Sequence, residues 1–207
     1  MKYRTIVVDP PWPYKSPGDH LGSSPEHRPN SYDSPIKGPG SRKRYGAMTL
    51  GELEMLSVPD LVESDAHLYL WTTNAFMVEA HALARAWGFR QKTILTWVKV
   101  HQDNPAKVSM KTGTYFRGAT EHVLFCVRGS LRLAVSEALP TAYLWPRLPH
   151  SVKPDAFLDL VERASPGPYL EMFARRNRLG WDTWGNECHE HMNLVVDTVS
   201  ASEYRTY

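Results

Sequence analysis

Hydrophobic residues in this chain gather in short runs that alternate with segments of helical spacing. Four apolar runs bounded by polar residues predict buried strands, at Thr5–Val8, His67–Trp71, Thr93–Val100 and Glu121–Val127. A fifth predicted strand is Tyr169–Ala174. Because segments of helical spacing lie between these runs, the pattern predicts an α/β fold with a mostly parallel, doubly wound sheet.

Three segments have apolar residues on one helix face and are expected to cover the sheet. The first is expected to begin after Thr49 and to end near Pro59. Gly88 is a suitable C-terminal stop for the second, and Pro154 suits the first turn of the third. The apolar positions are Leu50, Leu53 and Leu56, then Phe76, Ala80, Leu83, Ala84 and Trp87, and finally Phe157, Leu158, Val161 and Ala164.

Composition narrows the class of protein. A chain of 207 residues is expected to form a single domain, and 42% hydrophobic residues exclude a fully disordered chain. The two cysteines, Cys126 and Cys188, form no CxxC pair, so neither a disulfide scaffold nor a multi-cysteine zinc site is expected. No apolar run approaches a membrane span and no signal-peptide core is present, so we expect a soluble, cytoplasmic protein without a membrane partner.

Positive charge is concentrated in two expected loops. The whole chain carries a formal net charge of +2. Residues 13–44 hold six lysines and arginines against three acids, a net of +3, and are rich in proline, glycine and serine. They predict a mobile basic loop, either a solvated linker or a lid that contacts phosphate. A second basic loop near 106–120 contains Lys107, Lys111 and Arg117 and no acid.

The most distinctive motif is Asp9-Pro10-Pro11-Trp12, directly after the first predicted strand. Ligands of open α/β sheets bind at the carboxyl ends of the strands. The Asp9 carboxylate and the Pro10 carbonyl can each accept a hydrogen bond from an –NH2 group. Pro11 stiffens the turn, and Trp12 offers a flat surface on which a base can stack. The motif therefore predicts a pocket for the exocyclic amine of a nucleobase; the alternative is a turn with a core tryptophan.

This motif resembles the signature of the DPPW-type N6-adenine methyltransferases, relatives of the catalytic subunit of the eukaryotic mRNA N6-adenosine methyltransferase. Other segments are similar to the same family, in family order, from residue 5 to about 187. Two departures are Ala47, where the family has threonine, and the two residues that separate His150 from Lys153. The matching segments are Tyr45–Met48, His67–Trp71, Trp87–Phe89, Thr96–Lys99, Thr112-Gly113, Glu121-His122, Lys153–Asp155, Glu171–Arg175 and Gly185-Asn186.

The resemblance implies a Rossmann-like, S-adenosylmethionine (SAM)-dependent methyltransferase fold with permuted (beta-type) motif order, in which the catalytic strand precedes the cofactor strand. It implies that the four DPPW residues are catalytic and that Lys153 helps to fix the methionine end of SAM. The assigned cofactor-binding residues are Asp9, Lys153, Glu171, Arg175, Asn177, Asn186 and Glu187. The assigned substrate-binding residues are Trp12, Tyr45, Lys99, Lys111 and Arg117.

The implied reaction is direct methyl transfer to N6 of an adenine in nucleic acid, with DNA favoured over RNA. One alternative is a cytosine-N4 DNA methyltransferase, although such enzymes more often carry tyrosine or phenylalanine in place of Trp12. The other is a non-catalytic nucleic-acid-binding scaffold, against which the presence of Asp9 and Lys153 argues. No metal site is expected, because the adjacent residues Cys188–His191 cannot easily close a tetrahedral site. Whether a homo-oligomer or a partner subunit is needed stays open.

Overall fold

The computed structural model describes residues 1–14, 47–111, 115–149 and 152–185. The predicted loop at 13–44 therefore falls almost wholly outside the described residues, as do Tyr45, His150, Asn186 and Glu187. The elements in chain order are β1 (Tyr3–Val8), α1 (Leu50–Glu54), α2 (Val58–Leu61), β2 (Val62–Thr72), the 3-10 helix η1 (Asn74–Phe76), α3 (Met77–Ala86), β3 (Arg90–Val100), β4 (Thr120–Arg128), β5 (Ala142–Pro146), α4 (Asp155–Ala164), β6 (Tyr169–Met172) and β7 (Trp181–Trp184).

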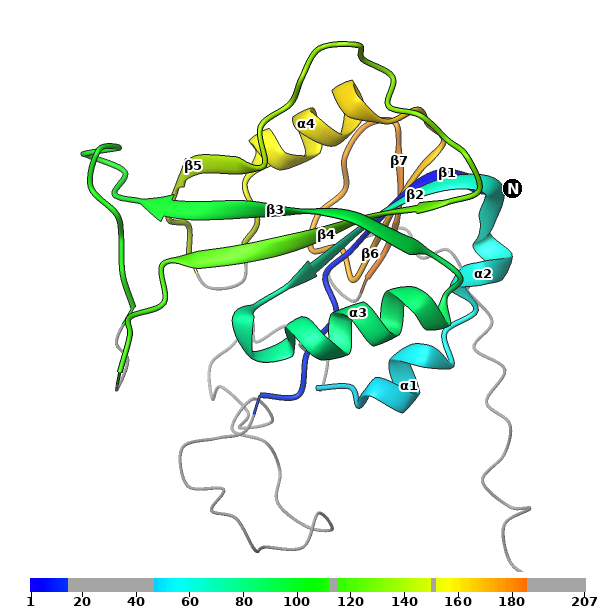
Figure 1. The fold of residues 1–207 in the computed structure, drawn as a ribbon, viewed down its shortest axis with the longest axis horizontal. Helices are drawn as coiled ribbons and strands as arrows, with labels where there is room; N and C mark the ends of the chain where they lie inside the picture. Colours follow the sequence, from blue (N-terminus) through cyan, green and yellow to red (C-terminus); the bar gives the residue numbers. More distant parts are fainter. Residues whose placement is uncertain (15–46, 112–114, 150–151, 186–207) are drawn as a thin grey trace, which may run out of the picture.

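Seven strands form one sheet in the order β5-β3-β4-β2-β1-β6-β7 (Figure 1). Strand β1 lies between β2 and β6 and is parallel to both. Strand β4 is antiparallel to its two neighbours, β2 and β3, while β5 is parallel to β3 and β7 is parallel to β6. The mostly parallel α/β sheet of a Rossmann-like fold is thus confirmed, with one strand reversed.

All five predicted strands are present, and the sheet contains two more. β5 is an edge strand with exposed residues alternating with half-buried ones, so it has no continuous apolar run. β7 is only four residues long and follows Gly180 directly. The predicted strand Tyr169–Ala174 is shorter than expected, because Phe173 has a φ of 61° and turns the chain after Met172.

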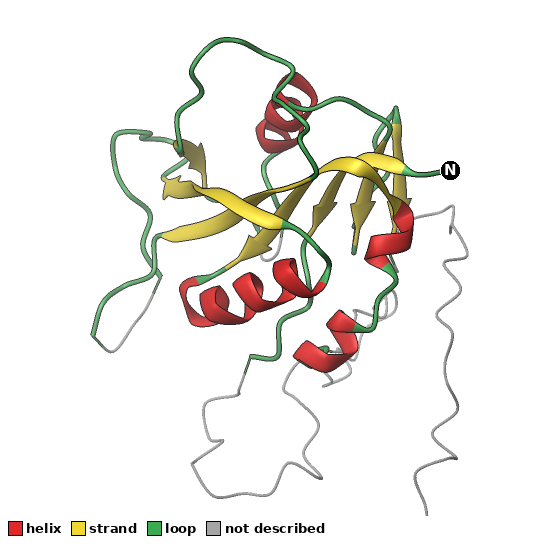
Figure 2. Ribbon diagram, turned by 45° about the vertical axis from the view of Figure 1, so that its right-hand side comes forward, coloured by secondary structure: helices red, strands yellow, loops and turns green. Residues whose placement is uncertain are grey.

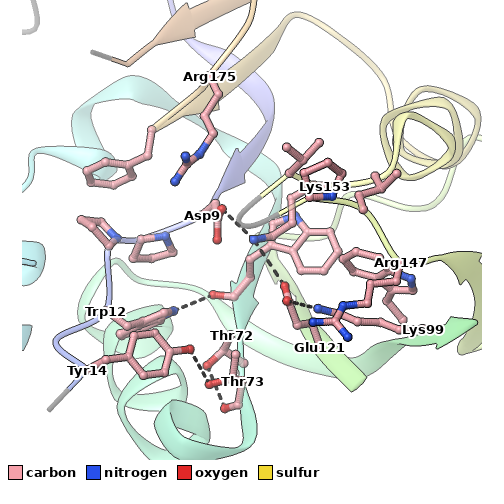
Figure 3. A pocket seen from close by; sticks show the side chains of 18 of the residues that line it. Asp9, Trp12, Tyr14, Thr72, Thr73, Lys99, Glu121, Arg147, Lys153 and Arg175 are labelled. Atoms are coloured by element: carbon pink, nitrogen blue, oxygen red, sulfur yellow. Dashed lines mark hydrogen bonds and ion pairs between the residues drawn. The ribbon is translucent and has the colours of Figure 1, made fainter. Parts of the chain in front are cut away.

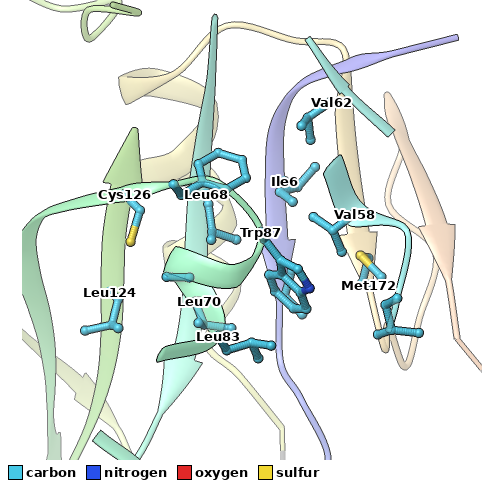
Figure 4. Close-up of a cluster of buried hydrophobic side chains, with 14 of the residues drawn as sticks. Ile6, Val58, Val62, Leu68, Leu70, Leu83, Trp87, Leu124, Cys126 and Met172 are labelled. Atoms are coloured by element: carbon cyan, nitrogen blue, oxygen red, sulfur yellow. The ribbon is translucent and has the colours of Figure 1, made fainter. Parts of the chain in front are cut away.

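Alternating residues of the strands bury two separate hydrophobic clusters, one on each face of the sheet. Ile6 and Leu70 pack with Leu83 of α3 on one face (Figure 4). Val7, the residue between Ile6 and Val8, belongs to the cluster around Phe157 of α4 on the other face. Helices α1 and α3 therefore cover one side and α4 the other, as Figure 2 shows, and the sheet is doubly wound.

Local sequence signals set most helix ends. Thr49 caps α1 through a capping box with Glu52, whose backbone N–H donates to the Thr49 hydroxyl at 3.3 Å. Pro59 does not end this helix as expected but lies in the first turn of the separate helix α2. Gly88, with φ of 80°, follows the end of α3 as predicted. Pro154 is the N-cap residue of α4, one position earlier than expected.

The strand directions decide where the chemistry gathers. Because all strands except β4 run the same way, their carboxyl ends meet at one edge of the sheet. The reversed strand β4 begins at this same edge, where Glu121 is paired with Trp97 near the end of β3. Asp9 directly follows β1 and so lies at this edge. Within the described residues, no helix is long and apolar enough to cross a membrane.

Candidate active site

A cavity of about 290 Å³ opens at the carboxyl edge of the sheet (Figure 3). All four residues of the DPPW segment line it. Tyr14 and Thr73 join across one side of it through a hydrogen bond of 2.9 Å between their hydroxyls. The position of this cavity agrees with the prediction from the DPPW motif that a ligand binds outside the end of the first strand.

Two tight backbone turns hold the DPPW segment in place. The Trp12 N–H donates to the Pro10 carbonyl at 2.9 Å, and the Tyr14 N–H donates to the Trp12 carbonyl at 2.9 Å. The Pro11 carbonyl accepts from the N–H of Met48 at 2.9 Å. A carbonyl oxygen has two lone pairs, so the Pro10 oxygen retains one acceptor position for a ligand.

Trp12 is both a core residue and a wall of the cavity. Only 6% of its surface is exposed, and its indole N–H donates to the Trp71 carbonyl at 3.1 Å. One ring face stacks on Phe76, with centroids 5.4 Å apart and planes 9° from parallel. Because Phe76 occupies that face, a substrate base has to meet the remaining surface of the indole. Base stacking on Trp12 stays a prediction.

Four charged side chains form a chain of ion pairs of alternating sign across the cavity (Figure 3). Asp9 Oδ2 lies 2.8 Å from Lys153 Nζ, and this ammonium lies 3.3 Å from Glu121 Oε2. The other oxygen of Glu121 accepts a hydrogen bond from Lys99. Lys153 also sits 5.1 Å from the centre of the Trp71 ring, a cation–π contact. The structure thus places Lys153 directly beside the DPPW carboxylate.

Within this chain of ion pairs, neighbouring groups of opposite charge stabilise each other's charged forms. Burial opposes the charge on Lys153, but the carboxylates of Asp9 and Glu121 outweigh it and hold the pKa of the ammonium above its usual value. Burial also opposes the charge on Glu121, yet Lys153 and Lys99 hold its pKa below the usual range. At Lys99 burial prevails over the Glu121 carboxylate and lowers the pKa. The centre of the cavity is therefore a strongly polar environment enclosed by tryptophans.

Glu171, on β6 beside Val7 of β1, is a half-buried residue that does not line this cavity. Its Oε2 atom has no hydrogen-bond partner among the described residues. Burial, followed by the charge of Asp9, raises its pKa to about 7. A carboxyl in this state pairs readily with hydroxyl groups, such as those of a ribose, because it can accept or donate a hydrogen bond.

The segment after β6 carries Arg175 into the cavity wall, where Figure 3 shows it on the Asp9 side. Backbone contacts fix this segment, since the Ala174 N–H donates to the Trp184 carbonyl at 3.0 Å. Gly185 approaches so closely that an added Cβ would lie 2.0 Å from the Ala174 carbonyl oxygen. The predicted cofactor residues Asn186 and Glu187 follow Gly185 and lie outside the described residues.

Three other assigned residues lie differently from the expectation. Asn177 does not line the cavity, and its side-chain oxygen accepts a hydrogen bond from Thr183 of β7 at 3.3 Å. Lys99 lines the cavity, but it is only 6% exposed and its ammonium is paired with Glu121. Arg117 is exposed and lies outside the cavity lining, whereas Lys111 belongs to that lining.

Sequence reasoning missed Glu121, Trp71 and Arg147 as cavity residues. The Glu121-His122 pair was noted only as part of the resemblance. His122 supports this region by contacts of its ring Nε2 with Asn74 Oδ1 at 2.6 Å and of its Nδ1 with the Thr96 hydroxyl at 3.1 Å. The direction of β4 is the missing information, since only a reversed strand brings its first residues to the edge where β1 ends.

The described residues bear on Cys126 and on metal binding. Cys126, within the predicted buried strand Glu121–Val127, lies in the core, and burial raises the pKa of its thiol to about 12. In the part of the chain that the structure describes, no three His, Cys, Asp or Glu side chains gather as a metal site would require. The segment Cys188–His191 lies outside that part.

Comparison with known proteins gives consistent matches along the chain. The sequence model of the MT-A70 family matches residues 3–187. The type II methyltransferase M.MunI of a Mycoplasma species is 33% identical over 190 residues, which cover 90% of this chain and 78% of that protein. The METTL3 catalytic subunit of the Homo sapiens N(6)-adenosine-methyltransferase is 25% identical over 99% of this chain. The Homo sapiens N(6)-adenine-specific methyltransferase METTL4 is 26% identical over 97% of it. The chain spans 31% and 41% of these two longer proteins.

Proposed function

The chain belongs to the MT-A70 family, and from this premise we propose that it methylates the N6 amine of adenine in nucleic acid with SAM as methyl donor. The observation that carries the proposal is the ion pair of Asp9 with Lys153 inside the cavity that the DPPW segment lines. In this pair Asp9, the proposed acceptor for the amine, lies next to Lys153, the residue assigned to the cofactor. We favour DNA as the substrate.

The residues around the cavity fit SAM. Its ribose hydroxyls suit the Oε2 atom of Glu171, which does not line the cavity itself and is buried without a partner among the described residues. Its methionine carboxylate suits a cation, and Lys153 and Arg175 both line the cavity. We assign these three residues to the cofactor, together with Asn186 and Glu187 on the strength of the family resemblance. SAM supplies an electrophilic methyl group on a sulfonium centre.

Asp9 and Pro10 orient the target amine. Adenine N6 is a poor nucleophile because its lone pair is delocalised into the ring. The Asp9 carboxylate and the second lone pair of the Pro10 carbonyl each accept a hydrogen bond from one N–H of the amine. These two hydrogen bonds draw the nitrogen toward tetrahedral geometry. The Asp9 carboxylate also stabilises the positive charge that develops on the nitrogen during transfer. The backbone turns that hold the DPPW segment keep both acceptors in place before the substrate arrives.

No strong base is required in this reaction. Alkylation makes the N6 nitrogen acidic, and the proton then passes to water. Asp9 is engaged with Lys153, which favours an electrostatic role over proton abstraction. An adenine within a duplex has to leave the base stack before it reaches this cavity.

The experiment that tests the function is incubation of the purified protein with isotopically labelled SAM and DNA that lacks modified bases, with RNA in parallel. Nucleosides from each sample are analysed by mass spectrometry. We expect label in N6-methyldeoxyadenosine, formed about 100–1000-fold more slowly when Asp9→Asn replaces the parent protein under the same conditions. Label in N4-methylcytosine, or in no nucleoside of either polymer, would contradict the proposal.

A further inference from the structure

The charges that line the active-site cavity do not balance. Within the described residues, five cationic and two anionic side chains line it. Lys153 and Lys99 are neutralised by Asp9 and Glu121 in the chain of ion pairs. Two other lining cations, Lys111 and Arg147, take no part in this chain of ion pairs.

The cofactor does not account for this surplus. SAM carries a sulfonium and an ammonium against one carboxylate, so its own net charge is positive, and an adenine ring is neutral. Arg175 lies on the Asp9 side of the cavity, where the methionine carboxylate can meet it, whereas Arg147 lies on the Glu121 side (Figure 3). Arg147 is therefore placed to meet an anion that comes with the substrate rather than with the cofactor.

The backbone of Arg147 is held in place by the sheet. It directly follows β5, and its N–H donates to the Val100 carbonyl at 2.9 Å, which extends the pairing of β5 with β3. The residue is exposed, and no ion pair of its side chain is found in the part of the chain that the structure describes. A fixed backbone with an unpaired, forked guanidinium is well suited to a planar two-point contact with phosphate.

Lys111 contributes a second positive charge from the loop between β3 and β4. Its backbone N–H donates to the Gly118 carbonyl at 2.9 Å, so this part of the loop is closed on itself. Lys111 and Lys99 both line the cavity. Lys99 forms an ion pair with Glu121, whereas no ion pair of Lys111 is found within the described residues.

We propose that Arg147, assisted by Lys111, binds a backbone phosphate next to the target nucleotide and so positions the adenine against Asp9. The inference rests on the proposed function, because it takes nucleic acid as the substrate. It adds a positioning residue that lies outside the DPPW motif and outside the family-like segments Lys153–Asp155 and Glu171–Arg175. A phosphate held on the Glu121 side and an amine held by Asp9 would fix the nucleotide at two points across the cavity.

The test is the salt dependence of binding to a short fluorescent oligodeoxynucleotide, with an oligoribonucleotide of the same sequence in parallel. Arg147→Gln should weaken binding by roughly tenfold and reduce the slope of log K against log salt by about one. Arg147→Lys should keep the slope, since the charge is retained. Arg132→Gln is the matched control, because Arg132 is an exposed arginine beyond the opposite end of β4.

Two further readouts separate this inference from the proposed function. Calorimetric titration should show the same SAM affinity for Arg147→Gln and for the parent; a weaker affinity would place Arg147 on the cofactor and overturn the inference. If the parent methylates adenine but Arg147→Gln keeps the parental salt slope, the inference is wrong and the function stands. If the parent yields no methylated nucleoside, the function fails, and the salt slopes still report whether Arg147 contacts phosphate.

Discussion

Asp9 and Lys153 are 144 positions apart in the chain and form an ion pair of 2.8 Å. Asp9 follows the first strand, and Lys153 precedes the last helix of the described part. The pair connects the DPPW segment to the segment that begins α4 across the end of the sheet. Glu121, 3.3 Å from the same ammonium, connects the start of β4 to this pair as well.

Asp9→Asn should abolish most of the methyl transfer with little effect on folding. The amide keeps the shape of the side chain, but it removes a negative charge and replaces one acceptor with a donor. Loss of one preorganised electrostatic partner typically costs about 100–1000-fold in rate. Glu121 still balances Lys153 in the variant, so the melting temperature should change little. Asp60→Asn, an exposed change on α2, is the control, and turnover of Asp9→Asn within threefold of the parent would exclude Asp9 as the amine acceptor.

Lys153→Ala should weaken the binding of SAM and of its demethylated product together, because both retain the methionine carboxylate. A charge-assisted hydrogen bond contributes about 1.5–3 kcal/mol, which corresponds to roughly 10–150-fold in affinity. Lys153→Arg should restore little, since a planar fork does not replace a compact ammonium between two carboxylates. Titration calorimetry with both ligands measures the effect, with Lys92→Ala, at an exposed site on β3, as control. Unchanged affinities would remove Lys153 from the cofactor site.

Glu171 should make the ligand-free protein less stable as the pH rises. Between about pH 4.5 and 7 the unfolded chain releases the proton of this carboxyl, while the folded chain retains it because its pKa is raised to about 7. The free energy of unfolding should therefore fall through this window, by about 1–3 kcal/mol, and become level above it. Denaturant unfolding at several pH values should show that Glu171→Gln loses this contribution. The exposed change Glu63→Gln should keep it, and identical pH profiles for Glu171→Gln and the parent would refute the prediction.

Lys99→Met should separate a positioning role from phosphate binding. Lys99 is buried against Glu121 and lies 4.4 Å from the centre of the Trp97 ring. Its loss leaves Glu121 with Lys153 as its only cationic partner among the described residues. We therefore expect the free energy of unfolding to fall by about 1–3 kcal/mol and the turnover to decrease. The salt slope of DNA binding should stay unchanged. A slope that falls by about one would restore the assignment of Lys99 to the phosphate backbone.

Replacement of residues 17–41 by a short Gly-Ser linker tests the basic segment near the N-terminus. The segment contains few apolar residues, so its removal should leave the melting temperature almost unchanged. The affinity for nucleic acid should fall and its salt dependence should flatten, because cations are lost. An unchanged salt slope would identify the segment as a solvated linker.

The sequence by itself determined the strands that bury apolar runs and the helices that cover them. A buried strand needs several consecutive apolar residues, and a helix face needs them at regular spacing, so both can be read locally. Val7 and its neighbours in β1, or Leu83 in α3, follow this rule. The DPPW motif could also be placed at the end of β1, because strand and motif adjoin in the chain. Its resemblance to a known family supplied the reaction.

Only the tertiary structure decided which charges face one another. The reversal of β4 brings Glu121 to the edge where β1 ends, and no local pattern encodes the direction of a buried strand. Lys99, in a segment that resembles the family, was assigned to the substrate, but its contact with Glu121 buries it. Arg147 has no motif of its own and becomes part of the cavity because β5 pairs with β3. Local spacing specifies the elements, whereas ion pairs between distant residues depend on strand order and direction, which are set by how the whole sheet packs.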